Sequence, residues 1–265
     1  MDTYTHGHAD PVLQSHRWRT VENSAAYLVP ALRPGLDVLD VGCGPGTITV
    51  DLAARVAPGR VTGIDVSADP LDEARAAAAR AGMDVAFAVG DVYALDWPDA
   101  SFDVVHAHQV LQHLTDPVAA LREMARVCRP GGVLAVREVD YGAFLTFPAD
   151  PGLDRWLDLY HRVARANGAE PDAGRRLLAW AHAAGLHDTV ATASTYCYAS
   201  QEERQWWGRS WAGRATASSF AEQAVGYGLA TTAELDEIAA AWLRWAEADD
   251  GWLGMMHGEL LIRLW

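Results

Sequence analysis

The chain has 265 residues and half of them are apolar, which is enough to bury the core of one large α/β domain. Its formal net charge is −14, all 21 basic residues are arginine and none is lysine, which argues against a nucleic-acid substrate and excludes a phosphate-binding lysine or a Schiff base. Three scattered cysteines without a C-x-x-C pair, no signal-peptide pattern and no apolar stretch of membrane-spanning length predict a cytoplasmic protein with no structural metal and no membrane partner.

Short apolar runs alternate with helical patterns over residues 36–141. The dipeptides Asp69-Pro70 and Asp116-Pro117 predict helix starts, and Gly82 predicts a helix end. Alternation of this kind predicts βαβ units and a parallel sheet, whose strands all end at one edge. The expected strands are 36–41, 60–66, 85–91, 102–108 and 133–139.

Beyond residue 141 this alternation stops. Trp207 and Trp211, four residues apart, favour packing within a helical cap over an aromatic wall for a ligand. A cap above the sheet edge should still place some aromatic side chains against a ligand. The expected elements are two helices in 142–180, a strand at 187–199, tryptophan-rich helices over 200–248 and a final strand at 255–265.

Polar residues follow the predicted strands, at the edge where ligands bind in open α/β sheets. The segment LDVGCGPGTIT, residues 39–49, follows the first strand and carries glycines with G-x-G-x-G spacing, unlike the G-x-G-x-x-G dinucleotide fingerprint. Asp65 ends the second strand, where a carboxylate can accept from both ribose hydroxyls, and Asp91 ends the third, where it suits an exocyclic amine. The structural alternative is a plain β–α turn that uses glycine for positive φ.

Four segments resemble, in order, the motifs of class I S-adenosylmethionine-dependent methyltransferases: VLDVGCGPG (38–46), GIDVS (63–67), AVGDVYALDWPDASFDVV (88–105) and RPGG (129–132). They are similar to those of the bacterial branch of ubiquinone/menaquinone-biosynthesis-type enzymes. The resemblance implies a Rossmann-like α/β fold, with a seven-stranded, mostly parallel sheet, helices on both faces, an antiparallel last strand and helical cap insertions. It implies methyl transfer from S-adenosyl-L-methionine to an oxygen, nitrogen or carbon atom of a small molecule, in bacterial secondary or quinone-type metabolism.

We expect a single methyltransferase domain over residues 1–265, and both a monomer and a homodimer are compatible with the sequence. In this family an N-terminal helix folds over the cofactor, so the resemblance implies a lid at the start of the chain. The expected parts are the lid helix (1–30), a cofactor-binding core (31–141), a substrate cap (142–180 and 200–250) and closing strands (187–199 and 255–265).

The resemblance also implies roles for the residues at the sheet edge. The glycine loop would lie against the methionine part of the cofactor, Asp65 would hold the ribose, and Asp91 and the Val92 backbone would bind adenine. The cofactor has no phosphate, and its sulfonium and ammonium suit nearby acids. Arg17, in the lid, is expected to meet the cofactor carboxylate, unless that helix is solvated and merely packs on the sheet. The expected cofactor-binding residues are Asp40, Gly42, Gly44, Gly46, Asp65, Val66, Asp91, Val92, His108, Gln109 and Arg17.

The fourth strand ends in HAHQVLQHL, residues 106–114, which supplies candidate chemistry. Strand alternation puts His106 and His108 on one face, and the resemblance places His108 nearest the transferring methyl group. His106, deeper in the strand, is expected to be a core histidine. His113 is the expected general base for an acceptor that must lose a proton, and the alternative is a structural imidazole bonded to a nearby loop.

The fifth strand ends in VREVDY, residues 136–141. Arg137 and Glu138 are strand neighbours and point to opposite sides, so they cannot pair. We expect Glu138 to face the substrate and Arg137 to pair elsewhere, with Asp140 and Tyr141 within reach of an aromatic acceptor. The candidate catalytic residues are therefore His113, His108 and Glu138.

Two other functions stay open at this point. One is a cofactor-bound enzyme that does not methylate, or a binding module, on the same fold. The other is a nicotinamide-dependent oxidoreductase, which the glycine spacing disfavours.

Overall fold

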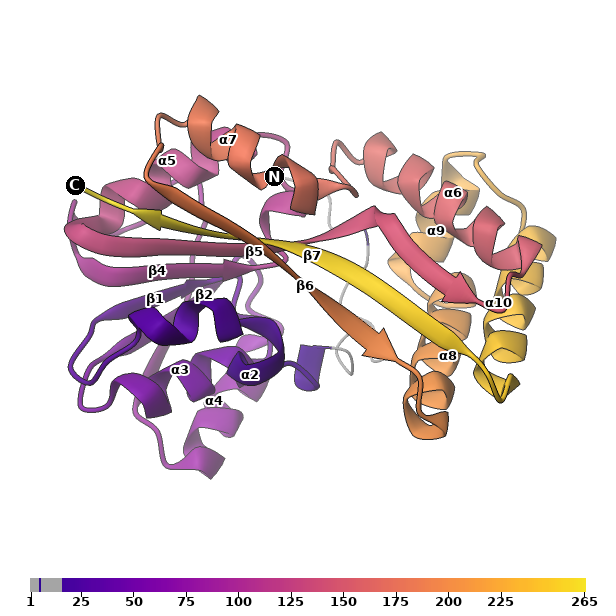
Figure 1. Cartoon of the computed structure of the whole chain (residues 1–265), viewed down its shortest axis with the longest axis horizontal. Helices are drawn as coiled ribbons and strands as arrows, with labels where there is room; N and C mark the ends of the chain where they lie inside the picture. The colour runs from indigo at the N-terminus through magenta and orange to yellow at the C-terminus, as the bar shows by residue number, and fades with distance from the viewer. Residues whose placement is uncertain (1–4, 6–15) are drawn as a thin grey trace.

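The computed structural model describes residue 5 and residues 16–265, and its centre is one seven-stranded sheet (Figure 1). The strand order is β3-β2-β1-β4-β5-β7-β6. Strands β1 to β5 are parallel, and β7 runs antiparallel to its neighbours β5 and β6. The predicted sheet with its antiparallel last strand is thus confirmed. The strands are β1 (Val38–Val41), β2 (Val61–Asp65), β3 (Val85–Val89), β4 (Phe102–His108), β5 (Cys128–Phe147), β6 (Thr189–Tyr198) and β7 (Trp252–Arg263).

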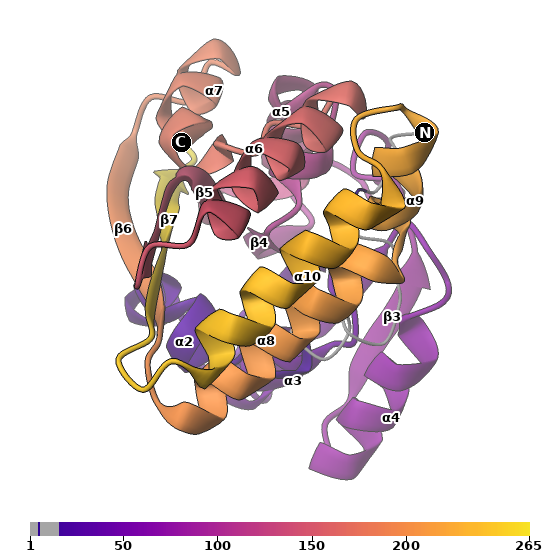
Figure 2. The same cartoon turned by 90° about the vertical axis from the view of Figure 1, so that its right-hand side faces the viewer.

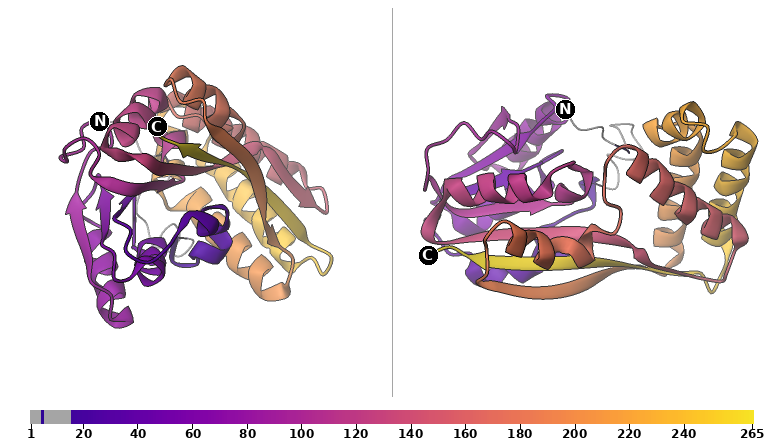
Figure 3. Two further views of the ribbon diagram at one scale, coloured as in Figure 1. Left: turned by 60° about the vertical axis from the view of Figure 1, so that its left-hand side comes forward. Right: turned by 90° about the horizontal axis from the view of Figure 1, so that it is seen from above.

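Helices cover both faces of this sheet, because successive strand residues point to opposite sides (Figure 3). They are α2 (Val21–Ser24), α3 (Thr47–Val56), α4 (Leu71–Ala81), α5 (Pro117–Val127) and α7 (Leu177–Ala183), with the 3-10 turns η1 (Ala26–Ala31), η2 (Leu111–His113) and η3 (Ala173–Arg176). On one face Val38 packs with residues of α2, η1 and α3. On the other face Leu39 packs with residues of α5 and α7.

Three paired strands continue from the core into a helical cap (Figure 1). β5 runs well past its predicted end at residue 139, to Phe147. Two charged residues of this buried stretch are tolerated because each is paired with an opposite charge, Arg137 with Glu259 and Asp140 with Arg175. Figure 2 shows the cap helices α8 and α10 side by side beyond the sheet. The cap helices are α6 (Pro151–Ala166), α8 (Gln201–Thr216), α9 (Ser219–Gly226) and α10 (Thr232–Glu247).

Tryptophan side chains form a core of their own inside the cap. Trp156 and Trp211 are fully buried, and their ring centroids lie 4.5 Å apart in an edge-to-face arrangement. One segment differs from the expected cap, because α7, at the end of 142–180, packs on the sheet through Leu177 and Ala181. Among the described residues no helix is long and apolar enough to cross a membrane.

Candidate active site

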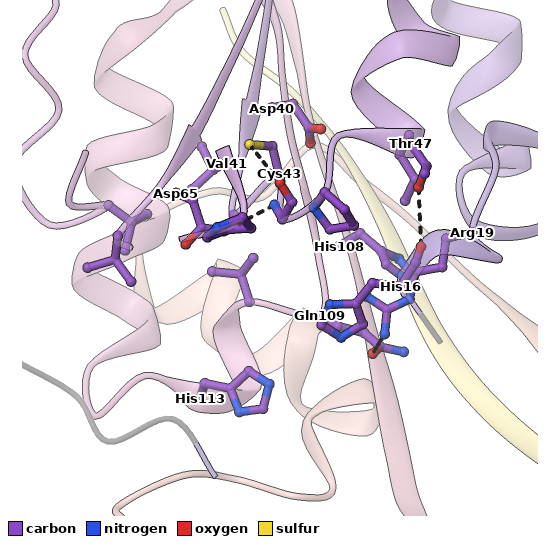
Figure 4. A pocket seen from close by; sticks show the side chains of 18 of the residues that line it. His16, Arg19, Asp40, Val41, Cys43, Thr47, Asp65, His108, Gln109 and His113 are labelled. Atoms are coloured by element: carbon purple, nitrogen blue, oxygen red, sulfur yellow. Dashed lines mark hydrogen bonds between the residues drawn. The ribbon is translucent and has the colours of Figure 1, made fainter. Parts of the chain in front are cut away.

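A cavity of about 260 Å³ lies at the edge where the parallel strands end, between the sheet and the cap. Its wall combines the loops after β1, β2 and β3, the turn after β4, and side chains from β5, β6, β7 and α8. Figure 4 shows the strand-end side chains converging on this space. The residues predicted for the cofactor that line it are Asp40, Gly42, Gly44, Asp65, Val66, Asp91, Val92, His108 and Gln109.

The glycine loop presents its backbone to the cavity at Gly44. This residue has φ +53°, and the nearest atom that an added Cβ would meet is Nδ1 of His16 at 3.9 Å. Its amide donates to a carboxylate oxygen of Asp65 at 3.1 Å, which ties the loop to the end of β2. Gly46 has a different role from the predicted one. It does not line the cavity, and a Cβ there would approach Cβ of Ala74 in α4 to 2.8 Å, so close helix packing requires glycine.

Asp40 is a buried carboxylate with two protein partners. It accepts from Oγ1 of Thr49 at 2.6 Å, and its other oxygen lies 2.7 Å from Nδ1 of His106. His106 is fully buried, as expected for a core histidine. Asp40 is therefore held rigidly beneath the glycine loop while still lining the cavity.

Asp65 and Asp91 stand at the ends of neighbouring strands and brace their own loops. Asp65 accepts from the amide of Ser67 at 3.0 Å, and Asp91 accepts from the amide of Tyr93 at 3.0 Å. Both carboxylates line the cavity, so the structure brings the two predicted acceptors into one site.

The arginine expected to reach the cofactor is not the one at the cavity. Arg17 forms an ion pair with Glu73 of α4, with Nε 2.5 Å from a carboxylate oxygen, and does not line the cavity. Arg19 lines it instead and donates to Oε1 of Gln109 at 2.6 Å. The two arginines are only two residues apart, but Arg17 points away from the cavity because it pairs with the carboxylate of Glu73.

Gln109 is fixed at the rim in an unusual backbone conformation. Its φ is +56°, a strained value for a residue with a side chain. His257 donates through Nδ1 to the carbonyl of Met255 at 3.1 Å, so its Nε2 accepts from the Gln109 amide nitrogen at 2.7 Å. Because Arg19 donates to the side-chain oxygen of Gln109, both polar atoms of this amide have partners.

His108 lies almost fully buried at the centre of the wall. Its Nε2 is 3.4 Å from the hydroxyl of Tyr196, which in turn lies 2.5 Å from Oγ of Ser24. Burial, aided by the nearby Arg19, holds the pKa of His108 well below its usual value. The imidazole is therefore neutral at physiological pH.

His113 lies in the turn η2 and lines the cavity. Burial, with a smaller contribution from Arg19, lowers the pKa of His113 to about 3. Its Nε2 lies 2.9 Å from the side-chain nitrogen of Gln112. The imidazole is therefore neutral, but the same low pKa makes it a weak base.

Glu138 does not face the cavity, contrary to the expected substrate contact. Its carboxylate accepts from the amides of Val110, Leu111 and Gln112, at 2.9, 2.8 and 3.3 Å, and thereby anchors the turn that carries His113. Burial raises the pKa of Glu138 to about 7. The structure thus gives Glu138 a positioning role.

Asp140 and Tyr141, at the same strand end, differ in whether they line the cavity. Asp140 accepts from Arg175 outside the cavity, with one oxygen 2.5 Å from Nη2, so it does not reach an acceptor. Tyr141 does line the cavity, as expected.

The far end of the cavity holds residues that were not predicted individually, although some aromatic side chains of the cap were expected to meet a ligand. Their positions depend on how β6, β7 and α8 pack against the core, and the spacing of the sequence motifs does not predict this packing. Only strand alternation in β6 and the i, i+7 spacing in α8 could have grouped some of them. They are Tyr196, Tyr198, Trp207, Arg214 and Met255.

Residues 32–202 match the family model described as "Methyltransferase domain". An uncharacterised methyltransferase of Schizosaccharomyces pombe is 34% identical over 269 residues, covering 98% of this chain and 96% of that protein. Among solved structures, the cyclase SpnF is similar with a TM-score of 0.54 at 24% identity, over 99% of this chain and 88% of that one. A phosphoethanolamine N-methyltransferase of Haemonchus contortus, solved with S-adenosylhomocysteine, has a TM-score of 0.54 at 17% identity, over 88% of this chain and 50% of that one.

Proposed function

The chain belongs to the methyltransferase family and is an S-adenosylmethionine-dependent enzyme, and from this premise we propose that it methylates a small molecule bound between the sheet edge and the cap. One observation carries the proposal. Asp40, Asp65 and Asp91, at the ends of three adjacent strands, line a single cavity together with the open backbone of the glycine loop. Such a site suits a ligand that is positively charged and has no phosphate.

Each of these residues has a proposed task. Asp65 accepts from the ribose hydroxyls, Asp91 accepts from the adenine amine, and the backbone of Val92 donates to the ring. The glycine loop and Asp40 surround the methionine part. Arg19 takes the role first expected of Arg17, because, of these two arginines, it is the one that lines the cavity.

When bound, S-adenosylmethionine supplies an activated methyl group on a positively charged sulfur. The protein has mainly to align the acceptor with that methyl group and to exclude water. His108 lines the cavity, and His113, which lines it too, is the proposed proton acceptor. Both imidazoles are neutral, since burial lowers the pKa of each.

Calorimetric titration tests whether the protein binds the proposed methyl donor. We expect S-adenosylmethionine and S-adenosylhomocysteine to bind and reduced nicotinamide dinucleotide not to bind. Binding of the dinucleotide alone would refute the assignment.

A cofactor-bound enzyme that does not methylate is the second candidate, since side chains of the cap line the cavity in addition to the predicted cofactor-binding residues. Incubation with methyl-labelled donor and a panel of phenols, hydroquinones and amines separates the two. Formation of S-adenosylhomocysteine supports methyl transfer, whereas tight donor binding without turnover across the panel supports the second candidate.

We also propose the finer placement in the ubiquinone/menaquinone-type branch, acting in bacterial secondary or quinone-type metabolism. The order and the residues of the four motifs between positions 38 and 132 support this placement. Turnover of hydroquinones in the same panel would test it.

A further inference from the structure

Under the proposed function the cavity has a donor end, at the loops after β1, β2 and β3, and an acceptor end, walled by β6, β7 and α8. Residues 16–19, named here the strap, lie at the donor end (Figure 4). His16 and Arg19 line the cavity, and the carbonyl of His16 accepts from Oγ1 of Thr47 at 3.2 Å. Arg17, between them, is exposed. The strap therefore separates the donor end of the cavity from solvent.

Trp18 connects this strap to the cap. Its side chain is not among the described residues that line the cavity, and it packs instead against the cluster of buried residues that forms the core of the cap. Three aromatic rings surround it, and we call them the Trp18 socket. The distances between ring centroids are 5.1 Å to Tyr196, 5.7 Å to Tyr198 and 6.0 Å to Trp206.

The chain that follows the strap is fixed to the core. Val21 is fully buried, and its amide donates to a carboxylate oxygen of Asp51 in α3 at 3.0 Å. On the outer side the strap is held by the ion pair of Arg17 with Glu73, which is partly exposed and therefore weak. A movement of the strap away from the cavity would thus turn about residues 19–20, and the packing of Trp18 is the main apolar contact that opposes it.

The socket belongs to elements that form the acceptor end. Tyr196 and Tyr198 line the cavity as well as contacting Trp18. Trp206, in α8, contacts Trp18 but is not among the described lining residues. A change in the cap can therefore reach the donor end through Trp18 without any contact between the altered residue and the donor.

Resting on the proposed function, we propose that Trp18 couples the cap to the donor end. S-adenosylmethionine and S-adenosylhomocysteine exchange with solvent when the Trp18 ring leaves its socket and the strap opens, so the cap controls how long the donor stays bound. Trp18 is in this sense a positioning residue, which acts through the strap.

The rates of donor exchange test this coupling. The association and dissociation rates of S-adenosylhomocysteine are measured by surface plasmon resonance on the immobilised protein. In Trp18→Leu we expect both rates to rise about tenfold and the equilibrium affinity to change much less, because a looser strap is open more often for entry and for exit. Damage to the binding site itself would raise the dissociation rate alone.

Further variants locate the coupling in the socket. Trp206→Leu alters the cap side only and should raise both rates as well, and its combination with Trp18→Leu should add little, because both substitutions remove the same contact. Trp18→Phe keeps an aromatic ring and should retain rates close to those of the unmodified protein. Trp265→Leu, which replaces a tryptophan that is 87% exposed, is the matched control and should leave both rates unchanged.

Three results would overturn the coupling: unchanged rates in Trp18→Leu, a rise in its dissociation rate alone, or independent effects of Trp18→Leu and Trp206→Leu that multiply in the double variant. A failure of S-adenosylhomocysteine to bind the unmodified protein would instead refute the proposed function. Binding to the unmodified protein is therefore measured first, which keeps the two failures distinguishable.

Discussion

The side-chain nitrogen of Gln109 lies 2.7 Å from Nε2 of His257, although 148 residues separate them in the chain. This bond joins the end of β4 to β7, the strand that continues into the cap. It also directs the oxygen of Gln109 toward Arg19. The placement of a cation at the donor site thus depends on a contact with the last strand of the fold.

Arg19 and Arg17 form a matched pair for testing the carboxylate contact. Arg19→Met should lower the affinity for S-adenosylmethionine roughly tenfold or more, because a charge-assisted hydrogen bond is lost. Arg17→Met should leave that affinity unchanged, since Arg17 pairs with Glu73. Calorimetry with the decarboxylated donor provides the control, and an equal loss for that ligand would contradict the assigned contact.

Asp65 is expected to dominate the affinity for the donor. Asp65→Ala removes both the ribose acceptor and the bond that holds the Gly44 amide, so we expect a loss on the order of 100-fold in calorimetric affinity. Asp69→Ala, at an exposed position on the following loop, serves as the comparison. Similar affinities for the two variants would remove Asp65 from the site.

His113→Ala should reduce turnover by about 100-fold while donor affinity stays the same, because the imidazole acts only on the acceptor. Since the pKa of His113 is near 3, this residue should add no acidic limb near pH 6.5 to the turnover profile. Unchanged turnover in His113→Ala would exclude it as the base.

Glu138 is expected to act through the turn it anchors. Glu138→Gln keeps an oxygen that can accept from the amides of 110–112, so it should preserve the shape of the pH profile for turnover. Glu138→Leu leaves buried amides without an acceptor, at a cost of roughly 1–3 kcal/mol each, and should lower the melting temperature markedly. Loss of one titrating limb in Glu138→Gln would instead indicate a catalytic carboxyl group.

Stability should fall as the pH drops below about 6.5. The pKa values of His108, His113 and His257 are lowered in the folded state, mainly by burial, so the unfolded chain takes up protons that the folded chain refuses. Glu138 opposes this between its unfolded pKa of 4.5 and its folded pKa of about 7, because there the folded chain holds the extra proton. We therefore expect a net uptake of about two protons, or roughly 2–3 kcal/mol per pH unit near pH 5.5.

Urea unfolding followed by tryptophan fluorescence at several pH values measures this slope. Glu138→Gln removes the opposing group and should make the slope steeper by up to one proton. If the free energy of unfolding did not change with pH in this range, the three imidazoles would not be kept neutral in the folded state.

The donor side of the site follows from local patterns. Strand, glycine loop and acid recur within short stretches, and the topology of a parallel sheet then brings Asp40, Asp65 and Asp91 to one edge. Arg17 and Arg19 could not be separated in the same way, because the deciding partner, Glu73, lies on another helix.

The roles of Glu138 and the acceptor end were hidden for a related reason. A charged residue in a buried strand signals a constraint, but whether it meets substrate or backbone amides depends on the folding of the 110–112 turn. Trp207 and Arg214 reach the cavity only because β5, β6 and β7 extend past the core and set the position of α8.

The backbone ladder of β5, β7 and β6, in which only the β5–β7 pairing has an irregularity, between Val139 and Phe144, has a practical consequence for protein engineering. Because the ladder fixes the distance between donor and acceptor ends, bending it would break inter-strand hydrogen bonds. The two segments at the cap end of this ladder, residues 148–166 and 199–251, could therefore be exchanged between homologues. Such an exchange should transfer the selectivity for the acceptor and leave the parallel sheet unchanged.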